Sequence, residues 1–311
     1  MTHIRKGVIT AAGRGTRQYP ASQTVQKELF PLVDVDGYAK PTLQLIVEEM
    51  LASGIEEICV VVNPTNAEPI QRHFQGLTEA ERRGQFAGKA WAELLSEALH
   101  DMAQRLTFVV QTTQDGFGHA VFQARKWVGD EPFVMMVGDH IYFSETETRC
   151  ARQIIAAAET HGGSVSSVAR IPEAHLSRYG TIAGTRLPGT DPPVYTITEM
   201  VEKPTRDYAR AHLRTTGLPD DQYLCFFGIH AFSPAIFDCL DYLIQSDLRQ
   251  RGEIQLTSAQ ELLLEREPYL ACEITGISYD MGIPEGLIQT QIALALRSPF
   301  AAQARAMLAT L

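Results

Sequence analysis

Apolar runs typical of β-strands alternate with segments of helical periodicity through the first half of the chain, and this alternation limits the possible folds more than any other feature. The predicted strands cover residues 7–12, 57–63, 106–111, 132–137 and 164–170, and the predicted helices cover residues 42–53, 67–75, 78–104, 119–127 and 150–161. Strands and helices in this order predict an α/β fold with a mixed, mostly parallel sheet sandwiched by helices.

The pattern changes after Pro172. Extended segments are expected at residues 179–183, 194–201 and 223–232, separated by loops that contain proline and glycine. They predict a smaller, more antiparallel lobe packed on the sheet. We expect a main domain of residues 1–283, in two parts of about 1–170 and about 171–283, and a mostly helical C-terminal segment of residues 284–311.

The charge and the cysteine content exclude several classes of function. A formal net charge of −10 argues against a nucleic-acid-binding surface, which is normally basic. No stretch approaches the roughly 20 apolar residues needed to span a bilayer, and the N-terminus lacks the apolar core of a signal peptide. The five cysteines are scattered and form no Cys-x-x-Cys pair. We therefore expect a cytoplasmic protein without nucleic-acid or membrane partners.

A glycine-rich turn follows the first predicted strand directly, in the segment Ala11-Ala12-Gly13-Arg14-Gly15-Thr16-Arg17. Glycines let backbone N–H groups approach phosphate oxygens, and the cations of Arg17 and Lys27 supply the charge that a triphosphate requires. A dinucleotide fingerprint would need a third glycine at Gln18, and a Walker loop would need Gly-Lys-Ser/Thr in place of Gln18-Tyr19-Pro20. The turn therefore predicts a phosphate site of another kind.

Gly13 to Arg17, Pro20 and Lys27 together resemble the opening signature of the sugar-phosphate nucleotidylyltransferases, and Pro31-Leu32-Val33-Asp34 is similar to their uridylyltransferase branch. The resemblance extends from Lys6 to about Leu296. It implies a Rossmann-like fold. It also implies an enzyme that transfers a nucleotidyl group, uridylyl from UTP on this branch, to a sugar 1-phosphate such as glucose 1-phosphate, with release of pyrophosphate.

Two alternatives stay open. Within enzymes, the substrates could be dTTP or another nucleotide and a sugar other than glucose. In a different class, the chain could be a non-catalytic regulator that binds nucleotide sugars. Such a sensor has no need to keep a full set of phosphate and metal ligands, and this argues against it; the set comprises Arg17, Lys27, Asp139, Lys203 and Asp280.

The resemblance assigns roles on the nucleotide side. Arg17 and Lys27 correspond to phosphate ligands, and the segment from Gln111 to Ala120 resembles the base-recognition stretch, in which Gln111 and Gly116 read the pyrimidine. A carboxamide has a donor and an acceptor, which suits the N3–H and a carbonyl of uracil or thymine. The expected nucleotide-binding residues are Ala12, Gly13, Gly15, Thr16, Gln111 and Gly116.

On the sugar side, Val201-Glu202-Lys203-Pro204 resembles the motif that holds the sugar 1-phosphate. Lys203 joins Arg17 and Lys27 as the expected catalytic cations. The expected sugar-phosphate-binding residues are Gly180, Glu202, Lys203 and Gly228.

Two carboxylates are expected to hold Mg²⁺. Asp139 follows an apolar strand, at the end where open α/β sheets bind ligands, and Asp280 occupies the second acidic position of the family. Two carboxylates with phosphate oxygens and water suit this ion. We do not expect His140 to be a ligand, because hard Mg²⁺ disfavours imidazole.

The chain departs from the family pattern near the expected ligands. Gln23, Gln26 and Ile229 stand where many relatives have a lysine, a proline and an arginine, and Gly138-Asp139-His140 replaces Pro-Asp-Val. These changes concern the choice of nucleotide and sugar and leave the reaction type intact.

The C-terminal segment carries more apolar side chains than an exposed tail should have. It either packs back on its own sheet or forms a contact between subunits, and we expect a homo-oligomer. The side chains concerned are Leu287, Ile288, Ile292, Leu294 and Leu296.

Overall fold

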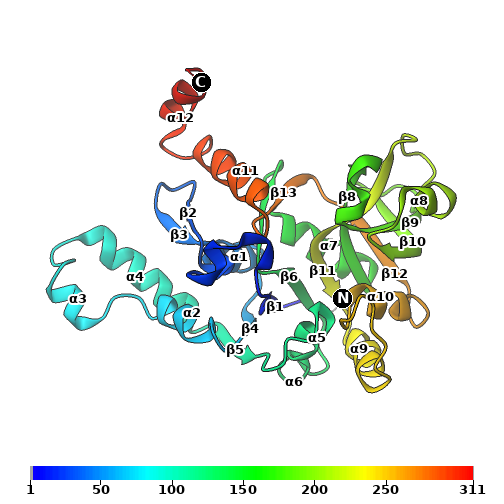
Figure 1. Cartoon of the computed structure of the whole chain (residues 1–311), viewed down its shortest axis with the longest axis horizontal. Helices are drawn as coiled ribbons and strands as arrows, with labels where there is room; N and C mark the ends of the chain where they lie inside the picture. The colour runs from blue at the N-terminus through cyan, green and yellow to red at the C-terminus, as the bar shows by residue number, and fades with distance from the viewer. Residues whose placement is uncertain (1–2, 311) are drawn as a thin grey trace.

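A computed structural model of the chain describes residues 3–310, and its centre is a nine-stranded sheet (Figure 1). In spatial order its strands are β5 (Leu106–Val110), β4 (Glu57–Val62), β1 (Lys6–Ala11), β6 (Phe133–Val137), β11 (Gln222–Phe232), β8 (Ser164–Pro172), β12 (Tyr269–Glu273), β10 (Val194–Glu202) and β9 (Gly180–Arg186). Two smaller pairs are a ribbon of β7 (His140–Ser144) with β13 (Gly276–Asp280), and a hairpin of β2 (Pro31–Val33) with β3 (Ala39–Pro41).

The first four strands in this order run parallel, as the alternation of strands and helices predicts. Because they share one direction, the loops that follow them lie at the same edge of the sheet. The segment 119–127, predicted as one helix, forms two short ones. The helices between these strands are α1 (Thr42–Ala52), α2 (Ala67–Phe74), α3 (Glu79–Arg83), α4 (Ala90–Ala103), α5 (Phe117–Phe122) and α6 (Arg125–Val128).

Beyond β6 the pairing is mixed, so the sheet is less uniformly parallel than expected. β11 pairs antiparallel with both β6 and β8, β12 pairs parallel with β8, and β10 pairs antiparallel with β12 and β9. The extended segments beyond Pro172 are therefore strands of the same sheet. The register of β11 against β8 shifts between Phe226 and His230. A short helix, α8 (Arg206–His212), follows β10.

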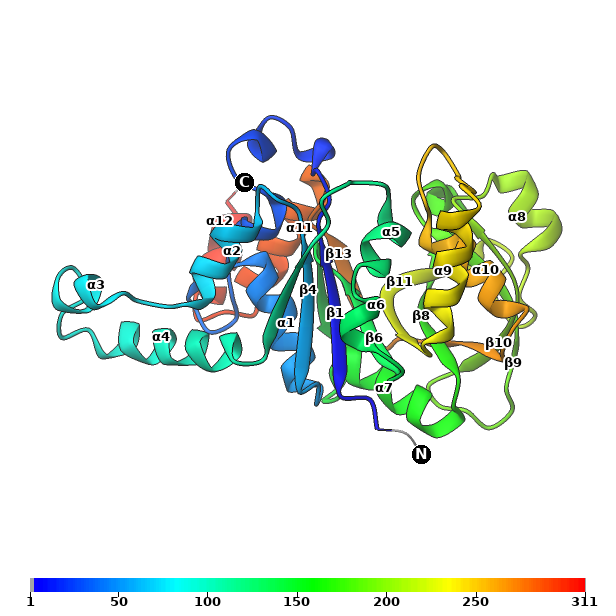
Figure 2. The same ribbon diagram turned by 90° about the horizontal axis from the view of Figure 1, so that it is seen from below.

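Helices cover both faces of the sheet, and each face has its own apolar core (Figure 2). Side chains alternate along a strand, so that Ile9 of β1 belongs to one core and Val8 to the other. The Ile9 core includes α1 and α7 (Cys150–His161). The Val8 core includes α5, α9 (Ala235–Gln245) and α10 (Leu256–Leu264).

Two segments extend away from the sheet. Residues 78–104, expected to be helical throughout, are interrupted by turns at residues 84–89, and α3 and α4 project from the body as an arm (Figures 1 and 2). The C-terminal segment forms α11 (Pro284–Ala295) and α12 (Ala301–Leu308), with residue 311 outside the described part. Within residues 3–310, every helix is too short or too polar to cross a membrane.

Candidate active site

The loops that follow β1, β4 and β5 enclose a cavity of about 490 Å³. A cavity of this size at the carboxyl ends of parallel strands is typical of a ligand site. The oxygen of the Gln26 side chain is buried there, without a hydrogen-bond partner in the described part of the chain. The lining residues are Arg14, Ser22, Gln23, Gln26, Asn63, Pro64, Thr65, Thr112 and Gln114.

Three amide side chains hold the start of the glycine-rich loop. Asn66 donates to the Ala11 carbonyl (2.7 Å) and Asn63 to the Ala12 carbonyl (3.4 Å). Gln114, from the loop after β5, also donates to the Ala12 carbonyl (2.9 Å). None of the three was assigned a role from the sequence, although Gln114 lies in the predicted base-recognition stretch and Asn63 ends a predicted apolar strand. These contacts join the ends of β1, β4 and β5.

The ribbon of β7 and β13 brings the two predicted metal ligands together. Asp139 precedes β7 and Asp280 ends β13, and the antiparallel register sets Asp280 opposite His140. The Met281 N–H donates to the Asp139 carbonyl (2.7 Å), which closes this end of the ribbon. Carboxylates from distant parts of the sequence therefore lie side by side.

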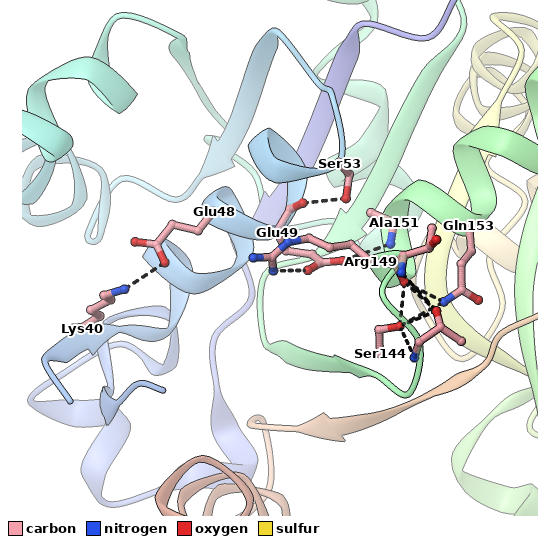
Figure 3. Close-up of polar contacts among 10 residues, drawn as sticks. Lys40, Glu48, Glu49, Ser53, Ser144, Arg149, Ala151 and Gln153 are labelled. Atoms are coloured by element: carbon pink, nitrogen blue, oxygen red, sulfur yellow. Dashed lines mark hydrogen bonds and ion pairs between the residues drawn. The ribbon is translucent and has the colours of Figure 1, made fainter. Parts of the chain in front are cut away.

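The other end of the ribbon is anchored to α7, which is in turn held by Glu49 of α1, as Figure 3 shows. Gln153 of α7 donates to Ser144 Oγ at the end of β7 (3.3 Å). Glu49 of α1 accepts from Arg149 (2.9 Å) and from the Ala151 N–H in the first turn of α7 (3.1 Å). The strand that carries Asp139 and His140 is thus fixed to the rest of the fold.

Lys27 lies in the middle of a cluster of charges. Its ammonium is 2.9 Å from Asp139 Oδ2 and 2.7 Å from Glu28 Oε1, and its side chain is only 9% exposed. Burial alone would lower the pKa of Lys27, but the two carboxylates outweigh it and raise that pKa above its ordinary value. Burial would likewise raise the pKa of Asp139, yet Lys27 and neighbouring cations hold it at about 2. Both groups are therefore charged at neutral pH.

Arg17 and Gly282 lie in the same cluster. Arg17 Nη1 is 3.1 Å from Asp280 Oδ2, and the arginine side chain is 59% exposed, so it is free to turn toward a ligand. A methyl group at residue 282 would lie 2.7 Å from Arg17 Nη2 and 2.8 Å from both Asp139 Oδ2 and Asp280 Oδ1. Glycine alone leaves this space open. Gly282, which was not assigned a role from the sequence, therefore belongs to the site.

His140, which we did not expect to be a ligand, reaches the same place. Ligating atoms of Asp139, His140 and Asp280 all lie within 4.8 Å of one another. Two ligands of one ion, each bound at about 2.1 Å, lie at most about 4.2 Å apart. The three side chains therefore need only a small contraction to hold a divalent cation.

The two predicted base-reading residues are adjacent. Gln111 is 2% exposed, and its Nε2 donates to His119 Nδ1 (2.9 Å) and to the Gly116 carbonyl (3.4 Å). This arrangement leaves Oε1 as the acceptor for a ligand. A methyl group at residue 116 would lie 2.6 Å from the Ile254 carbonyl oxygen, so the loop fits closely on the segment before α10.

The predicted sugar-side residues form a second group. The Glu202 carboxylate is 2.9 Å from Lys203 Nζ and accepts from Thr257 Oγ1 (2.8 Å). Gly180 pairs with Glu202 across β9 and β10. Thr257 was not assigned a role from the sequence.

The remaining predicted residues are placed as follows. Gly13 and Gly15 lie over the Lys27 side chain, and Gly228 lies beside His140. Within residues 3–310, the exposed Thr16 makes no side-chain hydrogen bond.

Phe226, two residues before Gly228 on β11, packs against Gly180. β11 therefore connects the group around the predicted metal ligands with the predicted sugar-side group.

Comparisons with known proteins agree over most of the chain. A family model described as nucleotidyl transferase matches residues 6–295. The chain is 36% identical over 298 residues to UTP–glucose-1-phosphate uridylyltransferase 2 of Staphylococcus saprophyticus, covering 96% of this chain and 94% of that protein. It is also 36% identical over 303 residues to UTP–glucose-1-phosphate uridylyltransferase 1 of Streptococcus pyogenes, covering 96% and 91%.

A solved structure of similar fold is described as UDP-glucose pyrophosphorylase complexed with UDP-glucose. It is 26% identical to the chain, with a TM-score of 0.73, and the match covers 93% of this chain and 98% of that one.

Proposed function

The chain belongs to the nucleotidyl transferase family, and from this premise we propose that it transfers the uridylyl group of UTP to glucose 1-phosphate, forming UDP-glucose and pyrophosphate. The names of its relatives support these two substrates. The observation that carries the proposal is the paired cluster in which Lys27 contacts Asp139 and Arg17 contacts Asp280.

This cluster suits a polyphosphate that arrives with a metal ion. A buried charge is costly unless it is paired, and here each cation has a carboxylate partner. When a metal-bound triphosphate binds, its phosphate oxygens would contact Arg17 and Lys27, and Asp139 and Asp280 would hold the metal ion. Lys27 can keep its contact with the buried Glu28 while Asp139 passes from Lys27 to the metal ion, and this supports a site for a metal-bound triphosphate.

We propose Mg²⁺ as the ion, with Asp139 and Asp280 as its protein ligands. Carboxylate oxygens are the donors that it prefers. When bound, it would neutralise phosphate charge and orient the reacting groups.

The proposed reaction needs no general base. A phosphate oxygen of glucose 1-phosphate attacks the α-phosphorus of UTP in line, while the bond to the pyrophosphate leaving group breaks. The second pKa of a phosphomonoester is about 6, so the nucleophile is already ionised at neutral pH. The chain has to hold two anions together, with Arg17 and Lys27 on the triphosphate and Lys203 on the sugar phosphate.

The two substrates would divide the main domain between them. UTP would bind the part of about residues 1–170 and glucose 1-phosphate the part of about residues 171–283, with Gln111 and Gly116 at the base and Glu202 at the sugar hydroxyls. All five cysteines are free and buried. This supports the cytoplasm as the proposed compartment, since it keeps thiols reduced.

The function is tested by pyrophosphate release with UTP and a panel of sugar 1-phosphates. We expect the highest kcat/KM with glucose 1-phosphate. Binding of UDP-glucose by calorimetry, without pyrophosphate release from any pair of substrates, would show a regulator in place of an enzyme.

Replacing Lys27 should damage binding of the triphosphate directly. We expect Lys27→Met to lower kcat/KM for UTP by about 10²–10³-fold, because a preorganised donor facing developing phosphate charge contributes at this level. Lys40→Met is the matched control, since Lys40 is also 9% exposed and contacts three carboxylates, Asp34, Asp36 and Glu48. Calorimetry of UTP binding and thermal melting check both variants. Equal loss of UTP affinity in both would contradict the assignment of Lys27.

The exposed apolar side chains of α11 lead us to propose a homo-oligomer. Leu294 is 2% exposed and packs in the chain's own core, whereas Ile288 is 61% and Ile292 40% exposed. We expect light scattering to give a multiple of the chain mass, and Ile288→Glu with Ile292→Glu to reduce it to one chain. A monomeric mass for the unaltered protein at micromolar concentration would reject this prediction.

A further inference from the structure

We infer that His140 is a third protein ligand of the metal ion, and that its imidazole makes the site bind Mn²⁺ in preference to Mg²⁺. The inference rests on the proposed function, since it concerns the same metal site. It does not remove Mg²⁺ as a working ion, because the two carboxylates remain available to it.

The position of the imidazole is set by the ribbon. His140 begins β7, and the antiparallel register sets it opposite Asp280. Its Nε2 is 3.9 Å from Asp280 Oδ1, which is too long for a hydrogen bond. Two ligands of a single octahedral ion lie between about 3.0 and about 4.2 Å apart. The separation of these two atoms falls in that range.

The other ring nitrogen cannot serve as the ligand. Nδ1 is buried and has no hydrogen-bond partner in the described part of the chain. It faces Gly228, where an added methyl group would lie 3.1 Å from Nδ1 and 2.9 Å from the Tyr142 hydroxyl. The protein thus packs closely against the Nδ1 side of the ring, and Nε2 is left on the side of the two carboxylates.

The donor set explains the preference between metals. Mg²⁺ selects an all-oxygen octahedral site, and an imidazole nitrogen adds little to its binding. Mn²⁺ accepts the same carboxylate, phosphate and water oxygens as Mg²⁺, but it belongs to the first-row transition metals, whose binding to sites that include nitrogen follows the Irving–Williams order. Two carboxylates with one imidazole therefore favour Mn²⁺ more than two carboxylates alone would.

The test measures the metal ion directly. Mn²⁺ and Mg²⁺ are titrated separately into the full chain by calorimetry, with and without UTP, and pulsed electron paramagnetic resonance of bound Mn²⁺ detects coupling to ¹⁴N. His140→Gln offers an amide in place of the imidazole at similar reach. His161→Gln is the matched control, because His161 is an exposed residue at the end of α7.

We expect ¹⁴N coupling in the unaltered protein and in His161→Gln, and its loss in His140→Gln. We also expect the ratio of the Mg²⁺ to the Mn²⁺ dissociation constant to fall at least about tenfold in His140→Gln, since loss of even a group that only supports a metal ligand costs about 10–100-fold in metal affinity. If His140→Gln does not fold, the spectrum of the unaltered protein decides alone.

Two results would overturn the inference: bound Mn²⁺ without ¹⁴N coupling, or an unchanged ratio of dissociation constants in His140→Gln. Pyrophosphate release with Mg²⁺, measured on the same preparation, separates this from the proposed function. Transfer without nitrogen coupling rejects only the His140 ligand. Absence of transfer with either metal rejects the proposed function itself.

Discussion

Asp139→Asn and Asp280→Asn are each expected to lower kcat by roughly 10³-fold or more while the protein still folds. A bound metal ion stabilises the transition state of phosphoryl-type transfer by several kcal/mol, and each 1.4 kcal/mol or so corresponds to tenfold in rate. An asparagine keeps the shape of the side chain but not the negative charge that the ion needs. The loss should remain at saturating metal and UTP, because the ion acts on the reaction as well as on binding.

The matched control is Asp238→Asn, on α9. Asp238 is 61% exposed and accepts from Arg125 (3.0 Å), a surface pair of the kind that contributes little to stability. Thermal melting and kcat are measured for all three variants. If both site variants have near-normal kcat and unchanged melting temperatures, the assignment of Asp139 and Asp280 as metal ligands is rejected.

The nucleotide preference is expected to be UTP first, dTTP second, and CTP, ATP and GTP lower in kcat/KM by about 10⁴-fold. A site that pairs the polar groups of its substrate rejects analogues with the wrong pattern at this level. Gln111 Nε2 is already bound to His119 Nδ1 (2.9 Å). Its Oε1 is therefore left to accept from N3–H, and cytosine presents a lone pair there. We expect purines to be excluded as well, because a slot beside Gly116 that fits one pyrimidine ring would not admit a second fused ring.

The test is a nucleotide panel with glucose 1-phosphate. Gln111→Met should reduce the ratio of kcat/KM between UTP and CTP, and Gln123→Met is the control, since Gln123 contacts His119 through its other ring nitrogen (3.1 Å). The highest kcat/KM with CTP, ATP or GTP would refute the base pocket. A preference for dTTP would refute only the choice of branch, because one methyl and one hydroxyl group separate the two substrates.

Sequence alone could predict the parts of the site that depend on local order. The glycine-rich turn follows β1 directly, and Asp139 follows β6, so each lies at a strand end whose position the parallel arrangement determines. Helix α7 has the predicted bounds, and α1 ends at Ala52, one residue before the predicted end at residue 53. These features depend on neighbours in the chain and on hydrophobic periodicity.

The rest of the site depends on contacts between distant segments. Only Gly138 and Asp139 separate β6 from β7, so periodicity cannot show that β7 leaves the main sheet to pair with β13. That pairing is what brings His140 to Asp280. In the same way, the Thr257 hydroxyl reaches Glu202 only because α10 packs beside β10, and nothing in the local sequence of either segment predicts this.

The place of β11 in the sheet determines how substrates can be enclosed. It is hydrogen-bonded to β6 on the nucleotide side and to β8 and β9 beyond it. The two sides are joined by backbone hydrogen bonds through β11. They therefore cannot rotate apart as rigid bodies without breaking these hydrogen bonds. Opening and closing must come from surface loops, or from flexing of β11 at its register shift near Gly228. A substrate that contacts both sides must therefore enter and leave without a rigid-body separation of the two parts of the sheet.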